Sequence, residues 1–455
     1  MAFWSRYSRV SYVVLAILLL AACGGATPAA PAATLAPATP ATNVPTSAAA
    51  IVALPAATTQ PATSTPAFDL ARWDSVPEAA RGQTVNWYMW GGSESINTFV
   101  DTFYGQPLKD RYGITLKRVP LSDTVDAVNQ VLSEKEAKQD PGSVDLIWIN
   151  GENFASLKQA TMLYGGWARK LPNSRFVNWQ NPAVHLDFGQ PIGDLESPWS
   201  SAQFQLIYDS ARMQPADLPR SYAQLKEWSC AHPGRFTYIA PGPGAFQGTR
   251  FVKGALFELS GGAEPWLTFD QALWDTWSPQ LWRYFNDLKP CLWRKGETYP
   301  KDENELHSLF ANQEIDFSLT LAIAGAGPLI DQGLIPKTSR AFVFDHNMIG
   351  DFNYVAIPSN APHKAAALVL ANLILDPALQ AAQIVPKNGF GLGFGIDVTK
   401  VDDPAAKATL AAAAQQLGDA ATPADQLAKA LVSDAAAPYQ ELVEQGWRKH
   451  ILQKP

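Results

Sequence analysis

The strongest constraint on the fold is an alternation of strand-like and helix-like segments between residues 84 and 163. Thr84–Trp90, Ile114–Val119 and Val144–Ile149 are rich in β-branched and aromatic residues, which is typical of strands. Helical periodicity follows them and is clearest in Thr124–Lys138, whose valines and leucine share one face. Val144–Ile149 is almost continuously apolar, as expected of a strand covered on both sides. The alternation predicts an α/β lobe with helices on both faces of a parallel sheet.

A second set of such segments follows along the chain. We predict strands at Ala202–Tyr208, Phe236–Ile239 and Asp316–Leu321, extended chain at Ala341–Ile357, and helices at Ser221–Ser229, Gly248–Leu259, Glu303–Ala311, His363–Leu375 and within Pro404–Gln453. Two α/β units joined by extended segments predict two lobes that face a cleft. We assign residues 81–205 to the first part of lobe 1, 206–345 to lobe 2, 346–400 to a return to lobe 1, and 401–455 to C-terminal helices.

Residues 1–22 have the pattern of a secretory signal peptide. Arg6 and Arg9 precede an uninterrupted apolar run from Val13 to Ala22, which is too short to span a bilayer. The run ends in Leu-Ala-Ala-Cys-Gly at positions 20–24, which resembles the lipobox of bacterial lipoproteins and would place a lipid on Cys23. The alternative is an ordinary signal peptide followed by a chance cysteine.

Residues 23–80 form a candidate tether. From Gly24 to Phe68 the chain is dominated by Ala, Pro and Thr and contains no charged residue. Such a segment has too little varied apolar surface for a core, and its prolines favour extended conformations. We therefore expect an extracytoplasmic protein that acyl chains hold at the periplasmic or cell-surface face of a membrane.

The composition excludes several classes of function. The formal net charge is −7 and no long run of one sign occurs, so the basic footprint of a nucleic-acid-binding protein is missing. The six histidines never pair at zinc-ligand spacing, and the chain has no G-x-S-x-G elbow, H-E-x-x-H motif or P-loop. We therefore expect no enzymatic activity, no metal and no cofactor. An exported glycosidase-like hydrolase is the main alternative, because its two carboxylates would leave no recognisable motif; a surface adhesin is a third class.

Three cysteines are present, and setting Cys23 aside leaves an even pair in an oxidising compartment. We predict a disulfide between Cys230 and Cys291, which would close a loop of about 60 residues and stabilise the fold by about 3–4 kcal/mol on the chain-entropy model. Two buried thiols are the alternative.

Of the fifteen tryptophans, many lie between residues 228 and 293. We expect most of them in the core and only some as ligand platforms.

Several motifs together resemble one family of transport proteins. The most distinctive is GSVDLIWINGENF at 142–154, and WGGS at 90–93, HPGRFTY at 232–238 and FQGTRF at 246–251 support it. They are similar to the YnjB-type periplasmic components of ABC transporters, which are related to solute-binding proteins for thiamine, polyamines, ferric iron and sulfate. The resemblance implies a two-lobed type II periplasmic-binding-protein fold that closes on a small solute and delivers it to a membrane permease. It also implies chain crossings near Gln203–Tyr208 and Ala341–Val355.

The partners that we expect are a small solute, ABC permease subunits and membrane lipid, without nucleic acid and with the protein as a monomer. Ligands of open α/β sheets bind beyond the carboxyl ends of the strands, so the loops there supply the candidate residues. The candidates are Trp90, Gly92, Ser93, Asn150, Glu152, Asn153, Trp199, Phe246, Thr249, Arg250 and Asp345.

Each candidate group has a functional and a structural interpretation. Gly92 and Ser93 could bring backbone N–H groups to a ligand, or simply form a tight turn. Glu152 could meet a cation, or favour a helix N-terminus. Arg250 would suit a carboxylate or phosphate, or form a salt bridge. Asp345 could neutralise a cation, or lie in a solvated loop.

Overall fold

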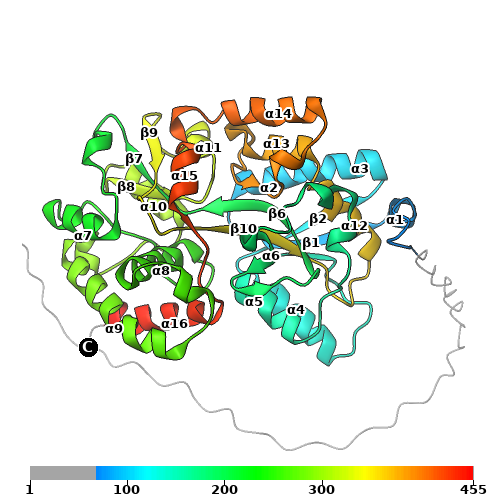
Figure 1. Cartoon of the computed structure of the whole chain (residues 1–455), viewed down its shortest axis with the longest axis horizontal. Helices are drawn as coiled ribbons and strands as arrows, with labels where there is room; N and C mark the ends of the chain where they lie inside the picture. Colours follow the sequence, from blue (N-terminus) through cyan, green and yellow to red (C-terminus); the bar gives the residue numbers. More distant parts are fainter. Residues whose placement is uncertain (1–67, 454–455) are drawn as a thin grey trace, which may run out of the picture. The chain divides into compact units, whose positions relative to one another are not determined.

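The computed structural model describes residues 68–453. These residues form two lobes, and each lobe has its own sheet and its own hydrophobic core (Figure 1). The predicted signal peptide, Cys23 and most of the predicted tether at 23–80 lie outside the described residues. The two-lobed α/β fold predicted from the sequence is confirmed.

The end of the assigned tether needs a correction. Helix α1 occupies Ser75–Ala80, and its Val76, Ala79 and Ala80 are buried in the core of lobe 1. These three positions are spaced so that one face of a helical turn is apolar, and that face packs on helix α12 (Lys364–Leu373). The folded body therefore begins before residue 81.

Lobe 1 is built on a seven-stranded sheet with the order β11-β6-β10-β3-β1-β2 and with β12 beside β10. Its strands are β1 (Thr84–Trp90), β2 (Thr115–Leu121), β3 (Leu146–Ile149), β6 (Glu196–Gln203), β10 (Met348–Ala356), β11 (Gly393–Phe394) and β12 (Leu431–Val432). The predicted parallel pairing is correct for β1 with β2 and for β1 with β3. Beyond β3, β10 pairs antiparallel with β3 and with β6, and β6 pairs antiparallel with β11, whereas the short β12 pairs parallel with β10.

Helices cover both faces of this sheet, and two separate apolar clusters lie beneath them. One face carries α1, α2 (Glu94–Phe99), a π-helical turn (Val100–Gly105), α3 (Gln106–Tyr112), α12, α13 (Pro377–Ile384) and α14 (Pro404–Gln415). The other face carries α4 (Val125–Glu136) and α5 (Gly151–Gln159). The short helix α6 (Pro182–His185), which contributes Val184 to the first cluster, leads into the hairpin of β4 (Leu186–Asp187) and β5 (Gln190–Pro191). The strand that we predicted to be covered on both sides, β3, lies between these clusters.

Lobe 2 contains a three-stranded antiparallel sheet with the order β8-β7-β9. Its strands are β7 (Gln205–Asp209), β8 (Phe317–Thr320) and β9 (Ser339–Phe342), and its helices are α7 (Tyr222–Ala231), α8 (Phe246–Ser260), α9 (Gln271–Leu288), α10 (Glu303–Ala311) and α11 (Gly327–Asp331). The core of this lobe takes up most of the tryptophan-rich region, including Trp266, Trp274, Trp282 and Trp293. Their expected role in the core is confirmed.

One predicted strand is wrong. Phe236–Ile239 is buried and extended but belongs to no sheet. Its neighbourhood bonds instead to an irregular segment, since Trp293 N–H donates to Phe236 O and Ala240 N–H to Pro300 O. A proline partner cannot supply the N–H groups of a regular ladder, so the extended chain stays outside the sheet.

The lobes are joined by strands that pass from one sheet to the other. A single residue, Phe204, separates β6 from β7, and five residues separate β9 from β10. The crossing strand β6 pairs with β10 from Gly350 opposite Gln203 to Ala356 opposite Glu196, with a register shift between Asn353 and Tyr354. A side chain at Gly350 would lie 2.8 Å from the Ala202 carbonyl oxygen, so only glycine fits where these strands converge.

The C-terminal residues do not form a separate layer. Helix α14 packs on α13 in lobe 1, whereas α15 (Ala424–Ala430) and α16 (Pro438–Trp447) contribute to the core of lobe 2. Between them, Thr422 donates to Gln205 at 2.7 Å and Gln203 donates to the Leu427 carbonyl at 2.9 Å. The C-terminal segment is therefore a third connection between the lobes and is bonded to the crossing strands themselves.

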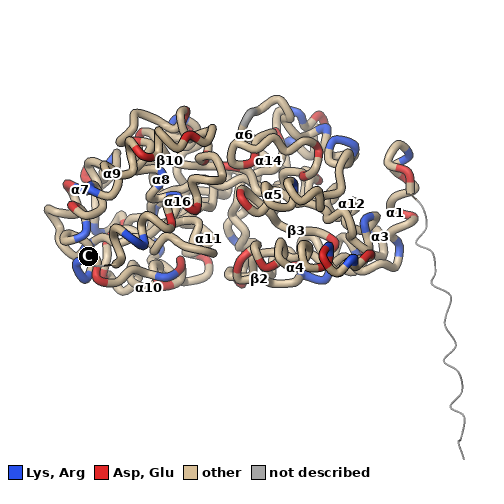
Figure 2. The backbone as a smooth tube through the Cα atoms, turned by 90° about the horizontal axis from the view of Figure 1, so that it is seen from below, with Lys and Arg blue, Asp and Glu red and all other residues tan. Residues whose placement is uncertain are grey.

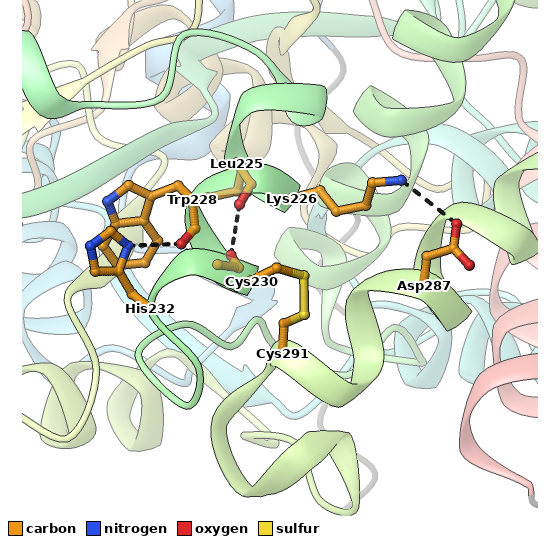
Figure 3. The surroundings of a disulfide bond; sticks show 8 residues. Leu225, Lys226, Trp228, Cys230, His232, Asp287 and Cys291 are labelled. Atoms are coloured by element: carbon orange, nitrogen blue, oxygen red, sulfur yellow. Dashed lines mark hydrogen bonds and ion pairs between the residues drawn. A yellow bond between two sulfur atoms is a disulfide. The ribbon is translucent and has the colours of Figure 1, made fainter.

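A disulfide joins Cys230 at the end of α7 to Cys291 after α9, which confirms the predicted pair (Figure 3). The two Cα atoms lie 4.8 Å apart and are separated by 61 positions in the sequence.

Positive and negative residues are interspersed over both lobes (Figure 2). Among the described residues no single helix is long and apolar enough to cross a membrane, although α12 and α13 pass that test together with a bend of 65°.

Candidate functional site

A cavity of about 190 Å³ lies between the two lobes. Its wall in lobe 1 comes from the loops that follow β1, β2 and β3, which are the carboxyl ends where ligands of parallel sheets bind. Its wall in lobe 2 comes from the start of α8, the start of α10, the end of β8 and helix α11. Pockets for drug-sized ligands usually measure about 300–1,000 Å³, so this cavity suits a small solute.

The loop after β1 presents Trp90 and Ser93 to the cavity, as predicted from the WGGS motif. The Ser93 hydroxyl accepts from Ile96 N–H and so caps α2, which explains the serine without any ligand. Gly92 does not line the cavity; the Trp90 ring lies where a side chain at this position would stand. Gly92 therefore lets the tryptophan fold back over its own loop.

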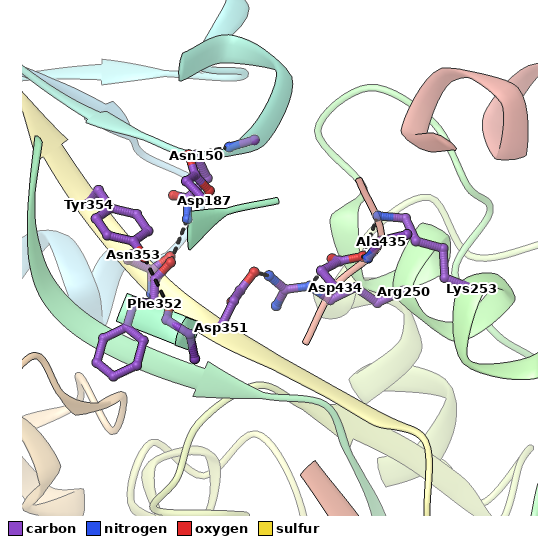
Figure 4. A network of polar contacts seen from close by, with 12 residues as sticks. Asn150, Asp187, Arg250, Lys253, Asp351, Phe352, Asn353, Tyr354, Asp434 and Ala435 are labelled. Atoms are coloured by element: carbon purple, nitrogen blue, oxygen red, sulfur yellow. Dashed lines mark hydrogen bonds and ion pairs between the residues drawn. The ribbon is translucent and has the colours of Figure 1, made fainter. Parts of the chain in front are cut away.

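The loop after β3 contributes Asn150 and Asn153, also as predicted. Asn150 Nδ2 donates to the Phe352 carbonyl on β10 at 2.7 Å, which fixes its side chain at the cavity (Figure 4). Asn153 is buried, lines the cavity and has no side-chain hydrogen bond to any described residue. Glu152 is half-buried and does not line the cavity, and its buried Oε2 atom lacks a partner among the described residues.

Trp148, inside β3, also lines the cavity, and sequence reasoning missed it. Its indole Nε1 donates to Asn353 Oδ1 at 3.2 Å, and its ring meets Trp199 edge to face with centroids 5.0 Å apart. Trp199, which we expected at the cavity, is fully buried behind Trp148 and Phe390. The continuous apolar pattern of the strand gave no sign that one of its residues faces a ligand.

Of the residues of lobe 2 that we predicted to bind a ligand, some line the cavity and others do not. Phe246 and Arg250 line the cavity near the N-terminus of α8, together with Gln247. Thr249 points elsewhere and donates to Glu444 at 3.1 Å. Asp345 is exposed between β9 and β10 and is not among the residues that line the cavity.

Two carboxylates that sequence reasoning missed line the cavity, Asp123 after β2 and Glu303 at the start of α10. The position of Asp123 after a parallel strand could have identified it, because the same rule selected the loops after β1 and β3. Glu303 carried no such signal. It reads as an ordinary acidic residue in the first turn of a helix.

Arg250 is held in a buried ion network and does not point freely into the cavity (Figure 4). Its guanidinium hydrogen-bonds the Asp351 carboxylate on β10 and lies 3.5 Å from the Asp434 carboxylate of the C-terminal segment. Lys253, one helical turn further along α8, completes the network with an ion pair to Asp434 at 2.7 Å. The two cations and two carboxylates balance, so the network presents no free positive charge to a ligand.

Further carboxyl groups are buried close to this network. Burial raises the pKa of Glu152 to about 7, and burial together with the neighbouring Asp351 carboxylate raises the pKa of Asp187. Burial and Asp187 likewise raise the pKa of Glu196, whose two carboxyl oxygens have no partner among the described residues. The region between the lobes is thus rich in acid, and no cluster of described residues is arranged to hold a metal ion.

Known proteins resemble this chain in sequence and in structure. The model of the family described as bacterial extracellular solute-binding protein matches residues 104–391. Protein YnjB of Escherichia coli strain K12 is 38% identical over 317 residues, which are 69% of this chain and 80% of YnjB. The structure of the spermidine/putrescine ABC transporter substrate-binding protein PotD from Streptococcus pneumoniae has a TM-score of 0.57 at 12% identity, over 81% of this chain and 98% of PotD. The periplasmic binding protein AfuA from Actinobacillus pleuropneumoniae, with fructose-6-phosphate bound, has a TM-score of 0.55 at 14% identity, over 82% of this chain and 99% of AfuA.

The ion network predicts a large effect of Arg250→Gln on stability. Without the guanidinium, Asp351 and Asp434 remain buried with Lys253 alone, and breaking a buried pair in this way typically costs about 3–5 kcal/mol. Urea unfolding should show a loss of that size. Arg72→Gln, which removes an exposed arginine from its pair with Asp69, serves as the control and should leave the midpoint unchanged. Equal effects of the two substitutions would contradict the network's role.

The buried carboxyl groups predict that the ligand-free protein loses stability as the pH rises from 6.5 to 8. Burial raises the pKa of Glu152 and that of Glu303 from 4.5 to about 7. Near neutral pH the folded state therefore retains protons that the unfolded chain has already lost, and this stabilisation disappears as the pH rises through 7. His307 acts in the opposite direction, because burial lowers its pKa from 6.5 to about 4, but its effect is nearly complete by pH 6.5.

Thermal unfolding in buffers of matched ionic strength measures this dependence. The melting temperature should fall between pH 6.5 and 8 in the wild type and fall less in Glu152→Gln and in Glu303→Gln. A melting temperature that rises over this interval would show that other groups dominate.

Proposed function

The chain belongs to the bacterial extracellular solute-binding proteins, and we propose that it captures its solute in the cavity between its lobes. It is the extracellular solute-binding protein of an ABC transporter and is no enzyme, since its family is described as solute-binding and PotD, which shares its fold, as the substrate-binding protein of an ABC transporter. The hydrolase alternative therefore loses its support. The observation that carries the proposal is that one cavity is lined by strand ends of lobe 1 and helix starts of lobe 2.

Contacts across the mouth of the cavity support capture by closure. Gly244 of lobe 2, at φ +72°, lies so close to the loop after β2 that an added Cβ would be 3.3 Å from the Ser122 carbonyl oxygen. On the other side, Ala324 N–H donates to the Gly391 carbonyl at 3.0 Å. A solute that touches both lobes would favour this closed arrangement over an open one, which is how binding shifts a two-state equilibrium.

The mature protein, in this proposal, is a monomer that lipid on Cys23 holds at the outer face of a membrane. The apolar run before the Leu-Ala-Ala-Cys motif and the uncharged segment after it support the anchor. Close to the membrane, the solute would have a short path to the permease. Spermidine and putrescine are the solutes that PotD's description names, and fructose-6-phosphate is bound to AfuA, so relatives of this fold accept solutes of opposite charge.

The site is tested by Trp148→Ala. A thermal-shift screen over amines, amino acids, thiamine and its phosphates, sugars and oxyanions identifies solutes that stabilise the wild type, since a ligand at a hundredfold over its Kd adds about 2.7 kcal/mol. Loss of the Trp148 ring should weaken the Kd of any such solute by about tenfold, in line with about 1.4 kcal/mol of aromatic contact. Trp277→Ala is the matched control, because Trp277 is also half-buried but lies in the other lobe outside the cavity. Equal affinities of the two variants would place the solute elsewhere.

The anchor is tested by Cys23→Ser in cells of the source organism or of a bacterial host with lipoprotein processing. Wild-type protein should pellet with membranes and partition into detergent, whereas the variant should be recovered in the soluble fraction with unchanged solute affinity. Mass spectrometry of the mature N-terminal peptide should show acyl chains on Cys23. A wild-type N-terminus that carries no lipid would refute the anchor.

A further inference from the structure

We infer that the solute is a small organic cation, an ammonium or cationic nitrogen heterocycle, held between Asp123 of lobe 1 and Glu303 of lobe 2. The inference rests on the proposed function, because it takes the cavity between the lobes as the solute site. It concerns the charge class of the solute, which neither the family nor the fold determines.

The balance of charge at the cavity wall is the first argument. Three charged side chains line the cavity: Asp123, Arg250 and Glu303. The positive charge of Arg250 is already matched by Asp351 and Asp434. Asp123 and Glu303 have no cation within ion-pair distance among the described residues. The charge that the cavity wall leaves unmatched is therefore negative.

Glu303 is positioned to meet a ligand and does not cap its helix. The neighbouring Asp302 fills the N-cap role for α10 by accepting from Glu305 N–H at 2.9 Å. The Glu303 carboxylate instead accepts from the side chain of Gln247, which also lines the cavity. Burial raises the pKa of this carboxyl to about 7, and its ionised form has no counter-ion among the described residues. A bound cation would supply that counter-ion.

Asp123 provides a second carboxylate at the cavity wall, from the opposite lobe. Its Oδ1 accepts from Val125 N–H at 3.0 Å, which orients the carboxylate at the end of β2. Its Oδ2 lies near Gly244 of lobe 2, at 3.8 Å from the position of an added Cβ. With one carboxylate from each lobe, closure gathers negative charge, and a cation between them would offset the repulsion. Closure would then depend on the charge of the solute.

Aromatic rings complete a site for an organic cation. Trp90, Trp148, Phe246 and Phe390 line the cavity, and aromatic faces attract ammonium and related cations through the ring quadrupole. Phe188 lines it too, but Lys253 already lies over its ring at 4.9 Å from the centroid. The protein thus uses the same interaction internally at the edge of the site.

An anionic solute would need the opposite arrangement. It would have to take Arg250 from Asp351, leaving that carboxylate buried beside Asp434 and without its main partner. Unpaired buried charges are strongly unfavourable, so the network opposes such an exchange. The same solute would also face Asp123 and Glu303 directly.

The experiment compares ligands that differ in charge but share a skeleton. The probes are benzylamine, benzyl alcohol and benzoate, and 1,4-diaminobutane, 1,4-butanediol and succinate, each measured by thermal shift and calorimetry at pH 7.5. We expect the amines to bind and the alcohols and carboxylates not to bind. Glu303→Gln and Asp123→Asn should each weaken the amines by about 10- to 100-fold, as expected for hydrogen bonds to a charged partner. Glu305→Gln, on the same helix but outside the cavity, should leave them unchanged.

Proton release separates ion pairing from a merely structural role of Glu303. The charged neighbour that acts on the pKa of Glu303 is Asp302 on its own helix, and the other charged residues that line the same cavity are Arg250 and Asp123. Calorimetry at pH 7 in phosphate and in Tris should show protons released when an amine binds the wild type, and fewer or none with Glu303→Gln. No release from the wild type would overturn the pairing with Glu303.

The outcomes distinguish the inference from the proposed function. If only the carboxylates or the alcohols bind, and Trp148→Ala weakens them, the cavity is the site but the cationic class is wrong. If amines bind and Trp148→Ala has no effect, the proposed site is wrong. If no probe of any charge binds, both the cationic class and the cavity as solute site are rejected for solutes of this size.

Discussion

The pairing of β6 with β10 is the constraint on which the crossing between the lobes, the ion network and the cavity all depend. Four consecutive residues of β10 perform separate tasks at the crossing. Gly350 admits the close approach of β6, and Asp351 pairs with Arg250 of lobe 2. The Phe352 carbonyl holds Asn150, and Asn353 holds the indole of Trp148. A change in the twist of this strand would therefore move the two walls of the cavity and the salt bridge together.

Local pattern was sufficient to predict several strands and helices of both lobes and the loops that line the cavity. Thr84–Trp90 was predicted as a strand and forms β1 with those bounds, and Glu303–Ala311 was predicted as a helix and forms α10. In both segments propensity, periodicity and the turn residues agree, so tertiary contacts had nothing to override. The rule that ligands lie beyond parallel strands then placed Trp90, Ser93, Asn150 and Asn153 at the cavity.

Several of the failures share one cause, which is that the deciding contact comes from a distant part of the chain. Arg250 was a candidate to bind an anion. In the structure its charge is paired with Asp351 and Asp434, which lie 101 and 184 positions away in the sequence. Trp199 looked like a cleft wall, but Trp148 and Phe390 lie in front of it. Phe236–Ile239 has the composition of a strand and lacks only a partner strand. A local sequence pattern contains no information about such distant partners, so residue spacing alone could not predict these contacts.

The position of the acidic groups relates stability to function. The network of Arg250 and Lys253 with Asp351 and Asp434 is neutral, yet Glu152, Asp187 and Glu196 are buried nearby with carboxyl oxygens that lack partners among the described residues. Desolvation of such groups opposes folding, and the pKa of each is raised as a result. The two aromatic-rich hydrophobic cores on either side of the crossing contribute stability that offsets this cost of desolvation. Asp187 and Glu196 are therefore kept neutral near pH 7, and the negative charge at the crossing would come from the carboxylates of Asp123 and Glu303 at the cavity wall. In the proposed mechanism this charge would discriminate among solutes before any specific contact forms.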